Sequence, residues 1–135
     1  MTLRECQRQL FGIWIIGSTP TFLLLFTRSL GTWRGDVLDV WGWFATVLGP
    51  TLSFMIAAYI AGGKNPSVAT RMADRALFQA ARLGSILYLL LILGVLVAAN
   101  RAAPALALMH DAEPGLGVAQ AVVCALLGYF HLTAK

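Results

Sequence analysis

Residues 40–63 read VWGWFATVLGPTLSFMIAAYIAGG and contain no charged side chain. Three further stretches, residues 10–27, 83–100 and 116–132, share this property. A helix of about 20 apolar residues crosses the hydrocarbon core of a bilayer, which is roughly 30 Å thick. The pattern therefore predicts an all-α membrane protein whose four transmembrane helices form a single domain over residues 1–135.

The composition points the same way. The chain of 135 residues is 59% hydrophobic and only 12% charged, whereas a soluble domain is typically about 25% charged. Its net charge of +4 comes from cations at the ends of apolar segments rather than from a basic run. We therefore expect the lipid bilayer as a partner and no binding of nucleic acid.

Arg4 and Arg8 precede the first stretch, as in a signal peptide. However, Pro20 interrupts the stretch and Arg28 follows it directly, with no small-x-small cleavage site. We expect it to be retained as the first helix.

The distribution of Lys and Arg predicts how the chain is threaded. With four crossings, seven cations fall on the side of the two termini and the second connection, and three fall on the other side. Cytoplasmic loops carry the excess of Lys and Arg. The sequence therefore predicts a multi-pass membrane protein with both termini and the second connection in the cytoplasm. The seven cations are Arg4, Arg8, Lys64, Arg71, Arg75, Arg82 and Lys135.

The connection between the second and third crossings is the longest polar segment. Pro66 suits the first position of a helix, because the N–H that proline lacks would have no partner there. The sequence predicts one helix from about Pro66 to Asn100, roughly 50 Å long and extended into the cytoplasm. Its charged residues suit either lipid headgroups or docking of a cytosolic partner, and both interpretations stay open. This candidate surface consists of Lys64, Arg71, Asp74, Arg75 and Arg82.

The other two connections are shorter. Asp36 is placed to cap the second helix, and the nearby tryptophans, Trp33, Trp41 and Trp43, are expected to anchor at the membrane interface rather than to form a ligand cage. Residues 105–109 are predicted to form a short helix lying on the outer surface. His110, Asp111 and Glu113 follow without a recognisable metal-ligand spacing, so a solvated turn is expected.

Two crossings carry glycine, proline and hydroxyl residues near their middles. A proline inside a helix removes one backbone donor and favours a kink. Hydroxyl side chains and neighbouring helices can bond the freed carbonyls. This pattern suits either a gate or polar path through the membrane, or an ordinary pair of kinked helices. The candidate kink or pore-lining residues are Ser18, Thr19, Pro20, Thr21, Pro50, Thr51 and Ser53.

The fourth crossing carries a small-residue stripe at near-helical spacing, which permits close approach of another helix. The contact can lie within the chain or between subunits. Asn100 and Gln120 are expected toward the outer ends of the crossings, and His131 toward the cytoplasmic end. The stripe consists of Gly117, Ala121, Ala125 and Gly128.

Recognisable chemistry is missing from the sequence. The crossings contain no deep Asp, Glu, Lys or Arg, and proton-coupled transporters normally depend on such a group. Cys6 and Cys124 are isolated in sequence and form no metal or redox motif. We therefore expect no catalytic residue, no metal, no cofactor and no enzyme activity.

Residues 13–18 (IWIIGS), 41–44 (WGWF) and 49–53 (GPTLS) resemble segments of small four-helix membrane proteins of bacterial conflict (anti-phage) operons. The resemblance covers about the first 60 residues and supplies no catalytic or binding position. It implies a membrane effector that forms homo-oligomers and perturbs the inner membrane when a cytosolic sensor signals.

Three functional hypotheses follow from the sequence. The first is an oligomeric inner-membrane effector or pore that acts in anti-phage defence. The second is a non-conducting anchor or accessory subunit that recruits a soluble partner through residues 64–82. The third is a small transporter, which the lack of intramembrane charge disfavours.

The predicted threading is directly testable. We expect a periplasm-dependent reporter fused after Lys135 to be inactive, and the same reporter inserted near Arg101 to be active. A cytoplasm-dependent reporter should give the opposite pattern at the two sites and serves as the control. Activity of the periplasmic reporter at the C-terminus would contradict the predicted orientation.

Overall fold

The computed structural model describes residues 2–31, 33, 35–64, 74–101 and 104–133. This part of the chain forms four long α-helices: α1 (Leu3–Leu30), α2 (Val37–Lys64), α4 (Arg75–Ala99) and α5 (Ala105–Thr133). Each contains a segment long and apolar enough to cross a membrane. The prediction of an all-α chain is confirmed for the described residues, as is that of four helices long and apolar enough to span a membrane.

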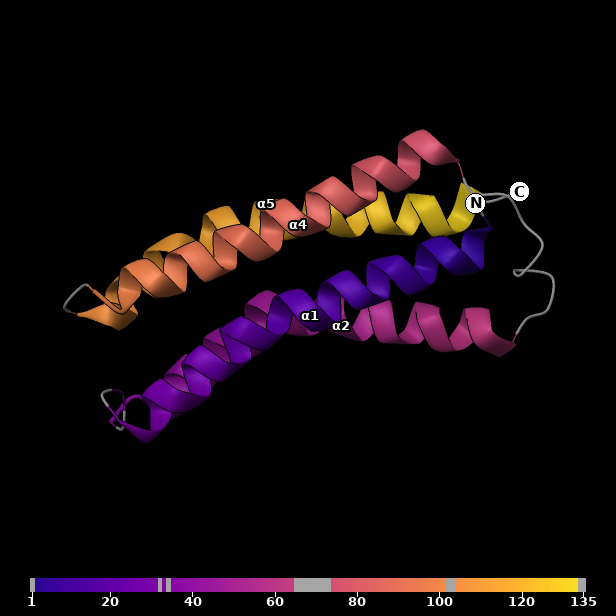
Figure 1. Ribbon diagram of the computed structural model, residues 1–135. Helices are drawn as coiled ribbons and strands as arrows, with labels where there is room; N and C mark the ends of the chain where they lie inside the picture. Colours follow the sequence, from indigo (N-terminus) through magenta and orange to yellow (C-terminus); the bar gives the residue numbers. More distant parts are fainter. Residues whose placement is uncertain (1, 32, 34, 65–73, 102–103, 134–135) are drawn as a thin grey trace.

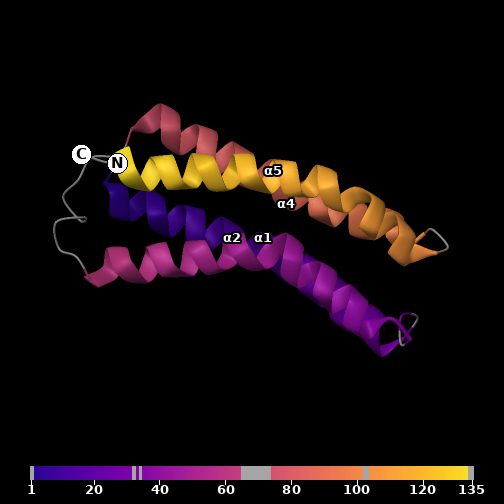
Figure 2. The ribbon, with the colours of Figure 1, turned by 180° about the vertical axis from the view of Figure 1, so that it is seen from behind.

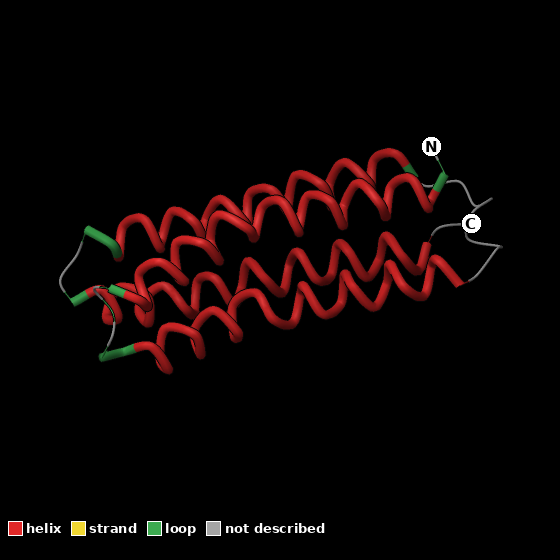
Figure 3. Tube along the Cα trace, turned by 60° about the horizontal axis from the view of Figure 1, so that its bottom comes forward, coloured by secondary structure: helices red, strands yellow, loops and turns green. Residues whose placement is uncertain are grey.

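The helices form two hairpins packed into one antiparallel bundle (Figure 1). The α1–α2 hairpin lies beside the α4–α5 hairpin, and both chain termini lie at the same end. The most extensive contact joins α4 to α5, while contacts of α1 with α4 and of α2 with α5 join the hairpins. Figure 3 shows all four helices running lengthwise in this arrangement.

The starts of α1 and α2 follow from local capping. Thr2 and Glu5 form a capping box, in which the Thr2 backbone N–H donates to Glu5 Oε2 (2.9 Å) and the Glu5 N–H donates to Thr2 Oγ1 (3.3 Å). Helix α1 therefore begins well before the predicted crossing at residue 10. Helix α2 begins directly after Asp36, and the Val40 N–H donates to the Asp36 carbonyl (3.0 Å).

Helix α4 begins at Arg75, so the predicted continuous helix from Pro66 is wrong at Asp74. Asp74 has an extended backbone conformation (φ −66°, ψ 118°). Its side chain accepts hydrogen bonds from the N–H groups of Ala76 (2.9 Å) and Leu77 (3.3 Å). An N-cap of this kind satisfies donors that have no partner within the helix. Pro66 itself lies outside the described residues.

Helix α5 also differs from the expectation. Residues 105–109 do not form a separate surface helix but are the first turns of α5, which continues through Pro114. Met109 is fully buried in the bundle. Because its side chain packs inside, this segment extends the fourth helix rather than lying across the outer surface.

Large side chains fill the bundle, and large apolar side chains also cover its outside. Trp14, Tyr88, Phe78 and Phe130 are buried almost completely. Ile16 is 74% exposed and Val118 69% exposed, and many other large apolar side chains on all four helices are exposed. A soluble protein rarely exposes so continuous an apolar surface. This surface is compatible with a surrounding lipid phase.

Helices α1 and α2 both change direction along their length, as the reverse view shows most plainly (Figure 2). Each contains an internal proline, Pro20 in α1 and Pro50 in α2. A proline ring clashes with the carbonyl four residues earlier, so a bend in both helices has a local cause.

Gly17 allows a particularly close contact between α1 and α4. A Cβ atom at this position would lie 2.6 Å from Leu89 Cδ1. Such a separation is well inside van der Waals contact, so any larger residue must displace the Leu89 side chain, which is itself buried. The absence of a side chain at Gly17 therefore leaves the room against α1 that the Leu89 side chain occupies.

We expect Gly17→Ala to lower the free energy of unfolding by about 1–3 kcal/mol, because the added methyl overpacks the contact with Leu89. Reversible unfolding in mixed detergent micelles, followed by circular dichroism, measures the change. Gly12→Ala on the same helix is the matched control, because its Cβ would meet no atom within 4 Å. Equal stability of the two variants would contradict the packing argument.

Candidate functional site

Polar side chains from two helices converge on the backbone carbonyl of Val47 in α2. The Tyr88 hydroxyl on α4 donates to this oxygen at 2.6 Å, and Gln120 Nε2 on α5 donates to it at 3.0 Å. Gln120 Nε2 also lies 3.2 Å from Thr51 Oγ1, which it can reach as a donor. We call these four residues, Val47, Thr51, Tyr88 and Gln120, the carbonyl cluster.

The carbonyl cluster lies in the helical turn before Pro50. Because proline has no N–H, Pro50 leaves the Thr46 carbonyl without its helical donor, and the bend that it favours makes the neighbouring carbonyls of that turn, including that of Val47, more accessible to outside donors. A carbonyl oxygen has two lone pairs, which allows Val47 to accept from two side chains at once. Thr51 also lies 3.6 Å from the Cys124 sulfur on α5. The cluster therefore joins α2, α4 and α5 at the proline of α2.

Two buried tryptophans add hydrogen bonds between the hairpins. Trp14 Nε1 on α1 donates to Ser85 Oγ on α4 at 3.1 Å, and the Trp14 ring lies 6.1 Å from that of Tyr88 between centroids. Trp43 Nε1 on α2 donates to the Met109 carbonyl on α5 at 2.9 Å. A buried indole N–H usually needs such an acceptor. These bonds and the carbonyl cluster fix the relative position of the two hairpins.

The expectation of three interfacial tryptophans is wrong for Trp43. Its side chain is 2% exposed and lies inside the bundle, and Trp33 is also buried. Trp41 is half-buried and packs edge-on against Phe22 (5.4 Å between centroids) and Phe44 (5.7 Å). The three rings therefore have different surroundings.

The structure divides the candidate kink or pore-lining residues into two groups. Ser18, Thr21 and Thr51 are buried, whereas Thr19, Pro20, Pro50 and Ser53 are exposed. Two of the hydroxyls bond their own helix, since Ser18 Oγ and Thr19 Oγ1 both donate to the Ile15 carbonyl, at 3.2 and 2.7 Å. The set is thus not brought together into one surface.

The two Pro-Thr steps are not equivalent. Thr51 takes part in the carbonyl cluster, whereas Thr21 Oγ1 is buried and has no hydrogen-bond partner in the described part of the chain. The repeated dipeptide therefore has different surroundings in α1 and α2.

The small-residue stripe faces away from the rest of the bundle. Gly117, Ala121 and Ala125 are exposed and Gly128 is half-buried. A Cβ atom at Gly117 or Gly128 would meet nothing within 4 Å. The close approach of α4 to α5 instead occurs at Gly84, whose Cβ would lie 3.3 Å from Leu126 Cδ1. Among the described residues, the stripe therefore makes no close contact within the chain at Gly117 or Gly128.

The candidate surface at residues 64–82 is only partly described. Arg71 lies outside the described residues, and Lys64 is the last residue of α2. Asp74 is exposed and caps α4 with its carboxylate, so it places one negative charge beside Arg75. Arg75 and Arg82 are exposed on α4. The structure therefore supports a cationic surface at this end of the bundle, with Asp74 assigned a structural role.

The polar residues His110 and Glu113 lie within one helical turn of α5. His110 Nδ1 lies 3.3 Å from Glu113 Oε2, three residues along α5. Within the described ranges, no group of three His, Cys, Asp or Glu residues is arranged to hold a metal ion. The predicted solvated turn is wrong in its secondary structure, since both residues lie inside α5.

Sequence reasoning misplaced Gln120 and missed Tyr88. Gln120 was expected toward an outer end, but it lies near the middle of α5 and bonds a carbonyl in the middle of α2. The sequence did carry a signal for Gln120, because a polar atom inside an apolar run needs a partner on another helix.

Comparison with protein-family models, with curated proteins and with solved structures finds no match for this chain.

We expect Tyr88→Phe and Gln120→Leu each to lower the free energy of unfolding by about 0.6–1.7 kcal/mol, the range of interhelical hydrogen bonds in membrane bundles. Tyr59→Phe is the matched control, because the half-exposed Tyr59 ring stacks on Phe11 and needs no hydroxyl for that contact. Reversible unfolding in mixed micelles measures all three. A loss for Tyr59→Phe as large as that for Tyr88→Phe would contradict the assigned role of the carbonyl cluster.

Proposed function

We propose that this protein is a non-conducting membrane anchor or accessory subunit that presents a cationic end to a soluble partner. The observation that carries the proposal is the filled interior of the bundle. Trp14, Phe78, Tyr88 and Phe130 occupy the space between the helices. The buried amide of Gln120 is bonded to backbone and hydroxyl oxygens rather than facing an open passage.

The cationic end supplies the recruiting surface. Arg4 and Arg8 near the start of α1, and Arg75 at the start of α4, are exposed. In the described part of the chain, none of these arginines lies within salt-bridge distance of a carboxylate. The α1 and α4 starts lie at the end of the bundle that carries both termini (Figure 1). These unpaired charges favour an acidic surface on the partner.

The proposed setting is the bacterial inner membrane, with this end in the cytoplasm. The support comes from the exposed apolar surface of all four helices and from the excess of Lys and Arg on the side of the termini. A cytosolic partner would then meet the cationic end directly.

An oligomeric membrane effector is the second candidate. The observation that favours it is the outward-facing small-residue stripe of α5, a surface that allows close approach of another helix. Conduction would then require a path between subunits. However, Thr19, Thr27 and Thr46 on the outside donate to carbonyls of their own helices, and such self-bonded hydroxyls are as suited to lipid as to water.

We expect Arg75→Glu to abolish capture of a cytosolic partner by the membrane-inserted protein, because the variant reverses charge on the recruiting surface. Affinity purification from membranes followed by mass spectrometry measures the capture. Arg101→Glu is the matched control, since it makes the same change just beyond the opposite end of α4. Partners lost equally in both variants would not support the proposed surface.

Dye release from vesicles separates the two candidates. Purified protein reconstituted into calcein-loaded vesicles should release no more dye than protein-free vesicles, because a filled bundle offers no passage. Leakage that rises with the amount of protein would contradict the anchor proposal and support the oligomeric effector.

A further inference from the structure

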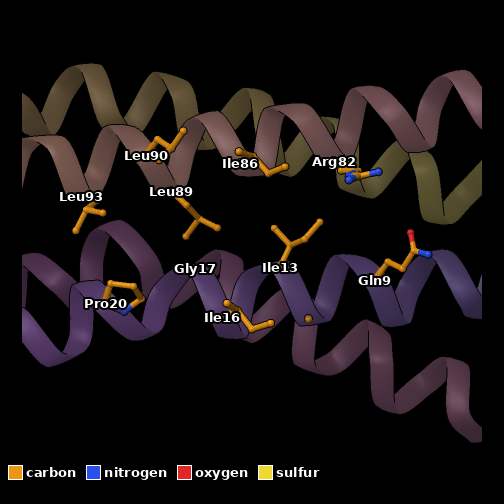
Figure 4. Close-up of a pocket in the computed structure, with 11 residues that line it drawn as sticks. Gln9, Ile13, Ile16, Gly17, Pro20, Arg82, Ile86, Leu89, Leu90 and Leu93 are labelled. Carbon is orange, nitrogen blue, oxygen red and sulfur yellow. The ribbon is translucent and has the colours of Figure 1, made fainter.

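A groove of about 710 Å³ runs along the outside of the bundle between α1 and α4 (Figure 4). Most of its lining is aliphatic. The side chains that form its walls include Ile13, Ile16, Pro20, Ile86, Leu90 and Leu93. The groove also contains Gly12, whose missing side chain leaves it open, since a Cβ there would meet nothing within 4 Å.

One end of the groove is polar. Gln9 on α1 and Arg82 on α4 lie across from each other at this end, and Pro20 and Leu93 lie at the other (Figure 4). Arg82 is exposed, and no carboxylate of the described residues lies within salt-bridge distance of it. An arginine guanidinium without a carboxylate partner is a strong donor to a phosphate group.

The length of the groove matches one leaflet of a bilayer. Gln9 and Pro20 are eleven residues apart along α1, and Arg82 and Leu93 are eleven residues apart along α4. At 1.5 Å per residue this is about 17 Å, close to half of the roughly 30 Å hydrocarbon core. Arg82 also stands at the boundary of the charge-free stretch of α4, which begins at Leu83. The polar end therefore falls at headgroup level.

From this geometry we propose that the groove binds one anionic glycerophospholipid. Arg82 and the amide of Gln9 hold the phosphate, and an acyl chain lies along the aliphatic walls toward Pro20 and Leu93. A spanning helix from a second copy fits the groove less well, because such a helix needs the full thickness of the membrane and has no need of an anionic group at Arg82. The proposal rests on the membrane location of the protein, but lipid retention is measured independently of partner capture.

Native mass spectrometry of the delipidated full chain tests the proposal. In a titration with dioleoyl phosphatidylglycerol, the wild type should bind one lipid tightly, and dioleoyl phosphatidylcholine should bind about fivefold more weakly, as expected for one cation acting on the net charge of the headgroup. Arg82→Gln should weaken binding of phosphatidylglycerol by a similar factor. Arg101→Gln, the same change beyond the other end of α4, should leave it unaltered.

A second variant tests the apolar part separately. Gly12→Leu fills the groove and should reduce retention of both lipids. Gly94 does not line this groove but lines a second one, of about 650 Å³, between α4 and α5, so Gly94→Leu should leave retention unaltered. Dihexanoyl phosphatidylglycerol, which has the headgroup but only short chains, should compete poorly, and inorganic phosphate should not compete. Three outcomes would each overturn the proposal. The two dioleoyl lipids could bind equally well, or Arg82→Gln and Arg101→Gln could lose the same amount of lipid binding. Alternatively, Gly12→Leu could abolish a dimer of the protein and leave lipid binding intact.

Discussion

Hydrogen-bond satisfaction at the Val47 carbonyl is the interaction on which the rest of the bundle depends. A proline in the middle of α2 distorts the turn before it, and an apolar surrounding offers no water to bond the exposed carbonyls. Tyr88 and Gln120 supply the donors from α4 and α5. Because both donors come from the second hairpin, the bend of α2 and the docking of the hairpins are parts of one arrangement.

The remaining contacts are arranged around this point. The Trp14–Ser85 bond and the Trp14–Tyr88 ring contact bring α1 to the same part of α4, and Gly17 lets α1 approach Leu89 closely. Large apolar side chains also cover the outside of all four helices. Specific polar bonds and close contacts, rather than burial of apolar surface from water, thus determine how these helices associate.

Helix number, helix type and approximate extent could be predicted from the sequence, because long charge-free runs leave a chain few alternatives. The start of α4 could not be predicted in the same way, because the continuous helix expected from Pro66 did not take Asp74 into account as an N-cap. Partners of polar side chains could not be predicted at all. Gln120 and Val47 are 73 positions apart in the chain, and only the packing of α2 against α5 brings them together.

The cap at Asp74 has a mechanical consequence. A single rod running from Pro66 into the membrane would transmit a push or a twist on its exposed end directly to the bundle. Helix α4 instead has its own start at Arg75, and the extended backbone of Asp74 interrupts the axis there. Forces acting on the chain before Asp74 are therefore not passed along a helix axis, and the orientation of α4 is set by its neighbours in the bundle.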